Sequence, residues 1–147
     1  LKAGIELAEK AGLAVDKGIK VDRTLQTSNA DIYALGDCAE VDGIWRPYVA
    51  PLMQCARTLG KTLAGGDDDA PGKVKYPTLP IMVKTHLCPV IAYPPADRSG
   101  EWTIEGDDHS VEASYLDDEG NLLGFALTGE ATKKRKDYLK NAPAIMD

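Results

Sequence analysis

An aspartate that directly follows a hydrophobic run is the part of this sequence best suited to chemistry. Residues 32–35 read Ile-Tyr-Ala-Leu, a run suited to a buried strand, and Gly36 and Asp37 come immediately after them. Ligands of open parallel sheets bind beyond the carboxyl ends of the strands. A strand over 32–35 would therefore present the Asp37 carboxylate to the hydroxyls of a sugar or polyol, while Gly36 would let that molecule approach the backbone closely. The alternative is a turn aspartate that only caps its own backbone.

The segments on either side of this run predict an α/β arrangement. Residues 5–11 predict a short helix, and the alternation in residues 18–22 predicts a strand. After an irregular stretch, residues 52–64 carry apolar side chains at helical spacing, and Pro51 suits the first helical position. The N-terminus of such a helix offers free backbone N–H groups and a partial positive charge, which suits it to an electron-rich group.

An acidic, glycine-rich stretch after residue 64 predicts a domain boundary. Residues 66–73 superficially resemble a phosphate-binding loop, but the spacing is wrong by one residue and three consecutive aspartates would repel phosphate. We therefore expect residues 1–66 to form part of one domain, residues 67–75 to form a linker, and residues 76–147 to form a small second domain.

The second domain is predicted to be a set of strands closed by a helix. The strand-forming runs lie at 79–85, 89–94, 101–105, 111–116 and 122–129. Residues 117–121 predict a hairpin turn at Gly120, and residues 130–141 predict a basic helix. The expected fold class is therefore α/β, a piece of an α/β domain followed by a small α+β domain.

Composition narrows the classes of partner. The 147 residues carry a net charge of −6 and a pI near 4.9, which argues against nucleic acid or an anionic membrane as a partner. No apolar run approaches the roughly 20 residues that span a bilayer. Three widely spaced cysteines without a signal peptide favour a reducing cytoplasm. His86 and Cys88 could share one side of a strand, but no second pair has suitable spacing, so no metal site is expected.

The segment from Thr27 to Asp37, TSNADIYALGD, closely resembles the second flavin-binding motif of the flavoprotein reductases that have two dinucleotide-binding domains. In that family the aspartate holds a ribityl hydroxyl of FAD. The resemblance thus implies that Asp37 is the polyol clamp of a bound flavin, and that the strand at 18–22 is the one preceding the motif. The fold it implies is the C-terminal part of an FAD-binding dinucleotide-type domain, followed by a small α+β C-terminal domain of strands plus a terminal helix.

Two further stretches resemble the rubredoxin reductases of that family. The stretch PYVAPLMQCAR implies that a main-chain group at Val49 meets the flavin, and PIMVKTHLCPVIAYPP implies that Lys84 contacts FAD. The aromatic Phe-Trp-Ser-Asp-type stretch usual in the related ferredoxin reductases is absent. The GxGxxG fingerprints for FAD and NAD(P)H are absent too, so we interpret the chain as a C-terminal fragment of a protein that binds NAD(P)H elsewhere.

The resemblance implies that the parent protein is an FAD-dependent NAD(P)H:rubredoxin oxidoreductase, with residues 76–147 as a candidate domain for docking rubredoxin. The flavin does the chemistry, so no catalytic side chain is expected in this segment, and the chain alone is expected to be inactive. The enzymatic alternative is a sister reductase for ferredoxin, flavorubredoxin or nitrite reductase. From a different class, the isolated chain could be a flavin-free docking module.

The other reactive or charged residues have simpler interpretations. Cys38 has no resolving partner and is expected to pack. Trp45 and Trp102 could stack or carry electrons, but buried packing is the commoner role. Residues 133–136, Lys-Lys-Arg-Lys, are either a solvated helix face or a docking patch for rubredoxins, which are acidic as a family.

Overall fold

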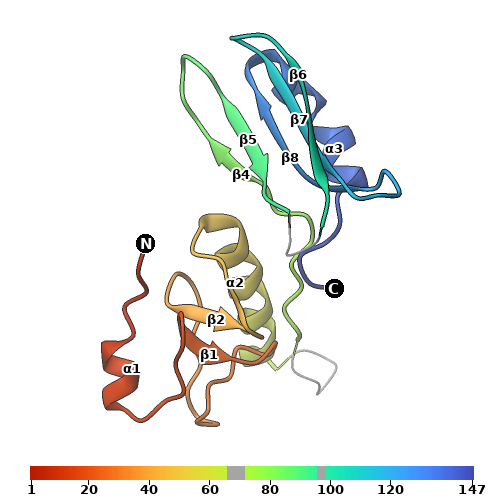
Figure 1. Cartoon of the computed structure of the whole chain (residues 1–147). Helices are drawn as coiled ribbons and strands as arrows, with labels where there is room; N and C mark the ends of the chain where they lie inside the picture. Colours follow the sequence, from red (N-terminus) through yellow and green to blue (C-terminus); the bar gives the residue numbers. More distant parts are fainter. Residues whose placement is uncertain (66–71, 96–98) are drawn as a thin grey trace. The chain divides into compact units, whose positions relative to one another are not determined.

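The computed structural model describes residues 1–65, 72–95 and 99–147. The chain divides into two compact units, Leu1–Tyr76 and Pro77–Asp147 (Figure 1). The predicted linker 67–75 lies partly outside the described residues, so its extent stays a prediction. Its described end belongs to the first unit, where Val74 and Tyr76 are buried and the Val74 N–H donates to the carbonyl of Arg23 at 2.7 Å.

The first unit joins a small sheet to one long helix. Its elements are α1 (Glu6–Lys10), β1 (Ile19–Val21), β2 (Ala39–Val41), β3 (Ile44–Trp45) and α2 (Val49–Leu63). Strand β1 pairs with β2 in parallel and β2 pairs with β3 antiparallel, so β2 is the central strand. All three residues of β2 are buried. The helix predicted at 5–11 and the strand predicted at 18–22 are confirmed with slightly shorter bounds.

The strand predicted at 32–35 is wrong. Tyr33 forms only an isolated bridge to Gln26, Ile32 is 38% exposed, and the strand follows the Gly-Asp pair instead of preceding it. The backbone of this run bonds to a preceding loop residue and not to a strand: the Ala34 N–H donates to the Leu25 carbonyl at 3.1 Å. A hydrophobic run becomes a strand only where a neighbouring strand pairs with it, and no described strand runs alongside these residues.

Helix α2 begins three residues before the predicted start. Val49 and Ala50 are its first two residues, and Pro51 sits third, where its missing N–H breaks no intrahelical hydrogen bond. The helix is anchored through Cys55, which is buried with its Sγ 3.1 Å from the Tyr76 hydroxyl. Burial raises the pKa values of both the Cys55 thiol and the Tyr76 phenol, so the pair is neutral and structural.

The second unit is a five-stranded antiparallel sheet backed by helix. Its elements are β4 (Ile81–Val83), β5 (Val90–Tyr93), β6 (Glu101–Gly106), β7 (Val111–Leu116), β8 (Leu122–Thr128), η1 (Gly129–Lys134) and α3 (Arg135–Asn141). The strand order is β4-β5-β8-β7-β6, so β4 and β6 are the outer strands and β6 is exposed along its length. The predicted strands are confirmed. The predicted hairpin is confirmed too, with Gly120 at φ +81° in its turn.

The core of the second unit lies between the sheet and the terminal helices. Ile91 pairs with Leu127 and Tyr93 pairs with Phe125, so these four buried side chains share the face that α3 covers (Figure 1). The Phe125 ring centroid is 5.0 Å from that of Tyr138 on α3. The single helix predicted over 130–141 is half right, because its first half is the 3₁₀ helix η1 and only α3 is α-helical.

Gly124 on β8 leaves no room for a side chain. A Cβ at this position would lie 2.7 Å from the backbone nitrogen of Pro95 and 2.8 Å from the carbonyl oxygen of Tyr93. We expect Gly124→Ala to lower the free energy of unfolding by about 1–3 kcal/mol, the usual cost of overpacking. Chemical denaturation measures this. Gly60→Ala is the control, since its Cβ would meet nothing within 4 Å and alanine favours the helix; equal stability of Gly124→Ala and wild type would contradict the expectation.

Glu112 on β7 links the sheet to both terminal helices. Its carboxylate accepts a hydrogen bond from the Tyr138 hydroxyl at 2.6 Å and forms an ion pair with Lys134. The hydrogen bond from Lys134, followed by the one from Tyr138, holds the pKa of Glu112 below its usual value. The ionised form of this carboxyl therefore stabilises the folded unit.

This depressed pKa predicts a loss of stability in acid. A carboxyl with a lowered folded pKa stabilises the protein above its unfolded pKa, and that contribution disappears as pH falls through the folded value. The free energy of unfolding of the wild type should therefore decline from about pH 5 downward, and Glu112→Gln should remove part of that decline. Denaturation curves across this range test it. Glu101→Gln, at an exposed carboxylate on β6, should leave the decline in place.

Candidate functional site

The Gly36–Asp37 pair forms a tight turn beside the start of α2. Gly36 has φ +88°, and a Cβ on it would lie 3.3 Å from Cδ1 of Leu52, so the turn packs against the first turns of the helix. The Trp45 indole N–H donates to the Asp37 carbonyl at 2.9 Å and fixes the turn from the other side. Sequence reasoning assigned Trp45 only to packing, stacking or electron transfer and missed this role.

The Asp37 side chain is exposed and free to bind a ligand. In the part of the chain that the structure describes, no N–H or O–H donates to its carboxylate. The alternative of a turn aspartate capping its own backbone therefore does not describe this residue. The turn fixes the backbone of Asp37 while its carboxylate is unengaged, so the carboxylate is suited to accept hydrogen bonds from hydroxyl groups of a bound molecule.

The N-terminus of α2 is uncapped. Tyr48, at the N-cap position, makes no side-chain capping hydrogen bond, and the first turn holds no acidic residue. Val49 is 71% exposed. The first N–H groups of a helix have no intrahelical partner and carry a partial positive charge. Val49, predicted as a flavin contact, thus lies at an exposed helix end with free backbone donors, three residues before Leu52, which packs against Gly36.

Arg46 is a candidate site residue that the sequence did not reveal. It lies between β3 and α2, and its Nε is buried without any hydrogen-bond partner in the described residues. Burial raises the pKa of the neighbouring Tyr48 phenol, and the positive charge of Arg46 partly offsets this rise. A lone arginine in a proline-containing loop has no distinctive pattern, so only the three-dimensional structure identifies it.

Lys84, the third predicted site residue, belongs to the second unit. It follows β4 directly and is exposed, as are His86 and Cys88 further along the same connection. Asp37 and Val49 therefore both belong to the first unit, while Lys84 belongs to the second. Within the described ranges no three His, Cys, Asp or Glu side chains are grouped as metal ligands.

The donor set of the first unit fits a flavin. An exposed carboxylate at Asp37 suits a polyol chain, and the uncapped helix end at Val49 suits electron-rich ring atoms. The buried Nε of Arg46 lacks an acceptor among the described residues, a situation that is rare for buried polar atoms in folded proteins. The first unit therefore offers a flavin one hydrogen-bond acceptor, the Asp37 carboxylate. It also offers two kinds of donor, the backbone N–H groups at the start of α2 and the Nε of Arg46.

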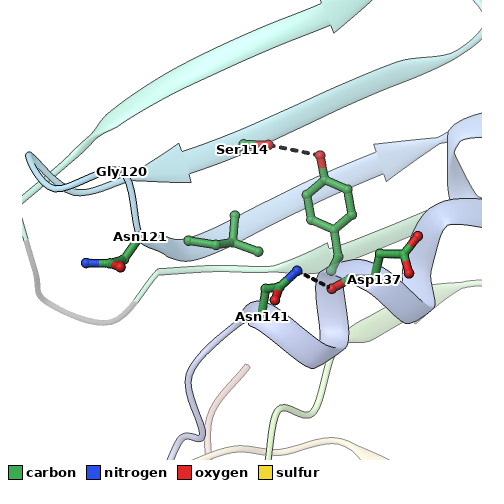
Figure 2. A pocket seen from close by; sticks show the side chains of 7 residues that line it. Ser114, Gly120, Asn121, Asp137 and Asn141 are labelled. Atoms are coloured by element: carbon green, nitrogen blue, oxygen red, sulfur yellow. Dashed lines mark hydrogen bonds between the residues drawn. The ribbon is translucent and has the colours of Figure 1, made fainter.

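A pocket in the second unit is a weaker candidate. It measures about 430 Å³ and is lined by Ser114, Gly120, Asn121, Leu122, Asp137, Tyr138 and Asn141 (Figure 2). Several of its polar groups are already used inside the fold. The Tyr138 hydroxyl bonds to Ser114 at 2.9 Å, and the Asn141 amide donates to the Asp137 carbonyl at 3.0 Å. None of the predicted site residues lines it.

The basic run 133–136 is half neutralised. Lys133 pairs with Glu130, and Lys134 pairs with Glu112. Arg135 and Lys136, the first two residues of α3, are exposed and form no ion pair within the described residues. Any electrostatic attraction from this run therefore comes mainly from its second half.

Comparison with known proteins finds a matching family for each of the two units. Residues 1–60 match the family described as pyridine nucleotide-disulphide oxidoreductase, and residues 73–142 match the rubredoxin binding C-terminal domain. The chain is 48% identical to the rubredoxin-NAD(+) reductase of Alcanivorax borkumensis over 147 residues. It is 40% identical to the rubredoxin-NAD(+) reductase of Acinetobacter baylyi over 148 residues. In both cases the alignment covers 99% of this chain but 37% of the relative.

The fold is also that of solved reductases. A crystal structure of a ferredoxin reductase from Rhodopseudomonas palustris superposes with a TM-score of 0.72 at 25% identity, covering 97% of this chain and 36% of that one. The chain thus spans about 37% of the length of the curated relatives it matches. The chain is thus a homologue of the rubredoxin-NAD(+) reductases, with one stretch that matches the pyridine nucleotide-disulphide oxidoreductase family and another that matches the rubredoxin binding C-terminal domain.

Proposed function

We propose that this chain is part of an FAD-dependent NAD(P)H:rubredoxin oxidoreductase. The observation that carries the proposal is the 48% identity to a rubredoxin-NAD(+) reductase along 99% of the chain. Both units contribute to that similarity, because the second one matches a rubredoxin-binding domain by itself. The first unit would hold part of the cofactor, and the second would meet the acceptor protein.

The residues of the first unit bind and orient the cofactor in this proposal. Bound FAD would supply the redox chemistry, taking a hydride from the nicotinamide and releasing electrons singly. The Asp37 carboxylate accepts hydrogen bonds from ribityl hydroxyls, and Trp45 holds the backbone of that turn in place through the Asp37 carbonyl. The exposed main chain at Val49 meets the flavin ring.

Lys84 is the third residue that we propose as a contact of FAD. Its ammonium would donate a hydrogen bond to the flavin, as the resemblance to the rubredoxin reductases implies. No side chain of this segment has to act as an acid or base, because hydride and electron transfer require none. The role of the protein is then to bind FAD and to set its reduction potential.

A cytoplasmic enzyme is the setting we propose. All three cysteines are free thiols, as expected in a reducing compartment. Among the described residues no helix is both long and apolar enough to cross a membrane. A ferredoxin reductase is the second candidate, favoured by the superposition with the Rhodopseudomonas palustris enzyme, but its 25% identity is well below that of the rubredoxin-NAD(+) reductases.

The proposal is tested with the full-length reductase that contains this segment. Purified with FAD, it is expected to oxidise NADH or NADPH and to bleach the visible absorption of oxidised rubredoxin. Ferredoxin offered at the same concentration should be reduced much more slowly. Equal or faster reduction of ferredoxin would make the second candidate the correct one, and a preparation without bound flavin would contradict both.

The isolated chain is expected to bind FAD weakly or not at all. Asp37, Val49 and Lys84 are placed to contact only the flavin and ribityl half, while a glycine-rich cradle for the pyrophosphate is missing from the sequence. Gel filtration of the purified chain with added FAD measures this. Stoichiometric FAD eluting with the protein would contradict it, whereas the full-length reductase should retain its flavin under the same conditions.

A further inference from the structure

Arg46 occupies the junction between the Gly36–Asp37 turn and the helix end. Its neighbour Trp45 bonds to the Asp37 carbonyl at 2.9 Å, and its own carbonyl accepts the Tyr48 N–H at 2.9 Å. Val49 then begins α2. The residues next to Arg46 thus connect it to the Gly36–Asp37 turn on one side and to the start of α2 on the other.

One N–H donor of the Arg46 guanidinium lacks an acceptor among the described residues. Among the described residues, its buried Nε has no hydrogen-bond partner, and no carboxylate forms an ion pair with it. Buried polar atoms are almost always paired, and arginine remains charged at any working pH. Arg46 is only half-buried as a residue, but a charged group with one buried, unpaired N–H points to a negatively charged or electron-rich partner that binds there.

No described carboxylate lies within ion-pair distance of the Arg46 guanidinium. Burial keeps the pKa of the Tyr48 phenol above its ordinary value, so this neighbour stays neutral near neutral pH. The first turn of α2 holds no acidic side chain. The partial positive charge of the helix end has the same sign as the guanidinium. The Asp37 carboxylate of the neighbouring turn is exposed, so solvent screens its charge, and the buried part of this junction carries the positive charge of the guanidinium and the helix end.

A positive field at a flavin favours its reduced form. A hydride carries two electrons and one proton, so its transfer from NAD(P)H to neutral oxidised flavin leaves one negative charge on the flavin ring while the nicotinamide becomes oxidised. A fixed cation nearby stabilises that charge, and the stabilisation is stronger in a partly buried site than in water. The same cation has little effect on the neutral oxidised ring.

We propose that Arg46 raises the reduction potential of the bound flavin by supplying fixed positive charge at the α2 end of the site. Arg46 is a positioning residue for charge in this assignment and takes no part in proton transfer. Because the assignment rests on the proposed FAD function, its test uses the FAD-loaded full-length reductase and does not depend on turnover.

The measurement is the midpoint potential of the bound FAD, obtained by equilibration with a reference dye. Arg46→Gln should shift the balance between oxidised and reduced flavin about tenfold toward the oxidised form, which lowers the potential by about 30 mV for a two-electron couple. Arg46→Lys keeps the charge and should stay close to the wild-type potential. Arg57→Gln removes an exposed cation from the outer part of the same helix and should leave the potential unchanged.

Each outcome decides the assignment. An unchanged potential in Arg46→Gln would overturn it, and so would an equal drop in Arg46→Lys and Arg46→Gln, since charge would then not be the cause. Where Arg46→Gln fails to fold or to hold FAD, Arg46→Met retains most of the aliphatic stem and takes its place. A full-length enzyme that carries no flavin, or that does not reduce rubredoxin, would instead contradict the proposed function. Both results are seen without measuring the midpoint potential, so they are distinguishable from a failure of the Arg46 assignment.

Discussion

FAD affinity of the full-length reductase is expected to fall about 10- to 150-fold when Asp37 is replaced by alanine. The substitution removes a hydrogen bond between a charged carboxylate and a ribityl hydroxyl, and such bonds contribute about 1.5–3 kcal/mol. The loss should appear in binding and not in folding, because the Asp37 side chain is exposed and makes no hydrogen bond within the described residues. Titration of the apoprotein with FAD, followed by flavin fluorescence, gives the dissociation constant.

Two further variants separate the carboxylate from its surroundings. Asp37→Asn keeps the size and one acceptor oxygen but not the charge, so its loss of affinity should be smaller than that of Asp37→Ala. Asp31→Ala removes an exposed carboxylate from the same segment and should leave FAD binding unchanged. If Asp37→Ala bound FAD as tightly as the wild type while remaining folded, the role of polyol clamp would be wrong.

Electron transfer to rubredoxin is expected to slow about tenfold at low salt when Arg135 and Lys136 are both changed to glutamine. These are the two cations of the basic run that no described carboxylate neutralises. An acidic partner would be steered toward them despite the net charge of −6, and such steering accelerates association by about 10-fold or more. Screening lengths fall from about 30 Å at 0.01 M salt to about 10 Å at 0.1 M, so the difference should shrink across that range.

The matched control removes an ion pair without changing the net charge. Glu130→Gln combined with Lys133→Gln eliminates the pair at the start of the run and should leave the salt profile of rubredoxin reduction as in the wild type. Reduction of a small neutral acceptor by NADH should be unaffected in every variant, because that step requires no docked protein. Identical salt profiles for the wild type and the Arg135/Lys136 variant would mean that the run is only a solvated helix surface.

Local sequence signals predicted the second unit well. The turn around Gly120 and the strand-forming runs of β7 and β8 depend on residues that are near one another in the chain, so pattern and structure agree. The length of α2 was also readable, apart from its start at Val49. Prolines in the first turn are compatible with several helix starts, which is why the sequence alone placed the start three residues late.

Features that depend on distant residues could not be predicted. The run 32–35 has the composition of a strand, yet strand formation requires a partner that the described sheet does not place beside it. Lys134 finds its carboxylate on β7, 22 residues away in the sequence, so nothing in the local pattern distinguishes it from Lys136. The unpaired Nε of Arg46 is equally invisible, because burial and the lack of an acceptor among the described residues are properties of the folded chain.

The order of strands in the second unit leaves both outer strands open to pairing with another chain. Such edges are templates for aggregation unless something interrupts them. Strand β4 is only three residues long, which limits what it can recruit. Strand β6 is six residues long and carries the exposed side chains of Trp102 and Ile104, but Glu101 and Glu105 alternate with them along the edge. If two copies of the chain approached through this edge, the carboxylates of one copy would repel those of the other. This repulsion opposes strand pairing between copies and so opposes growth of the sheet into a polymer.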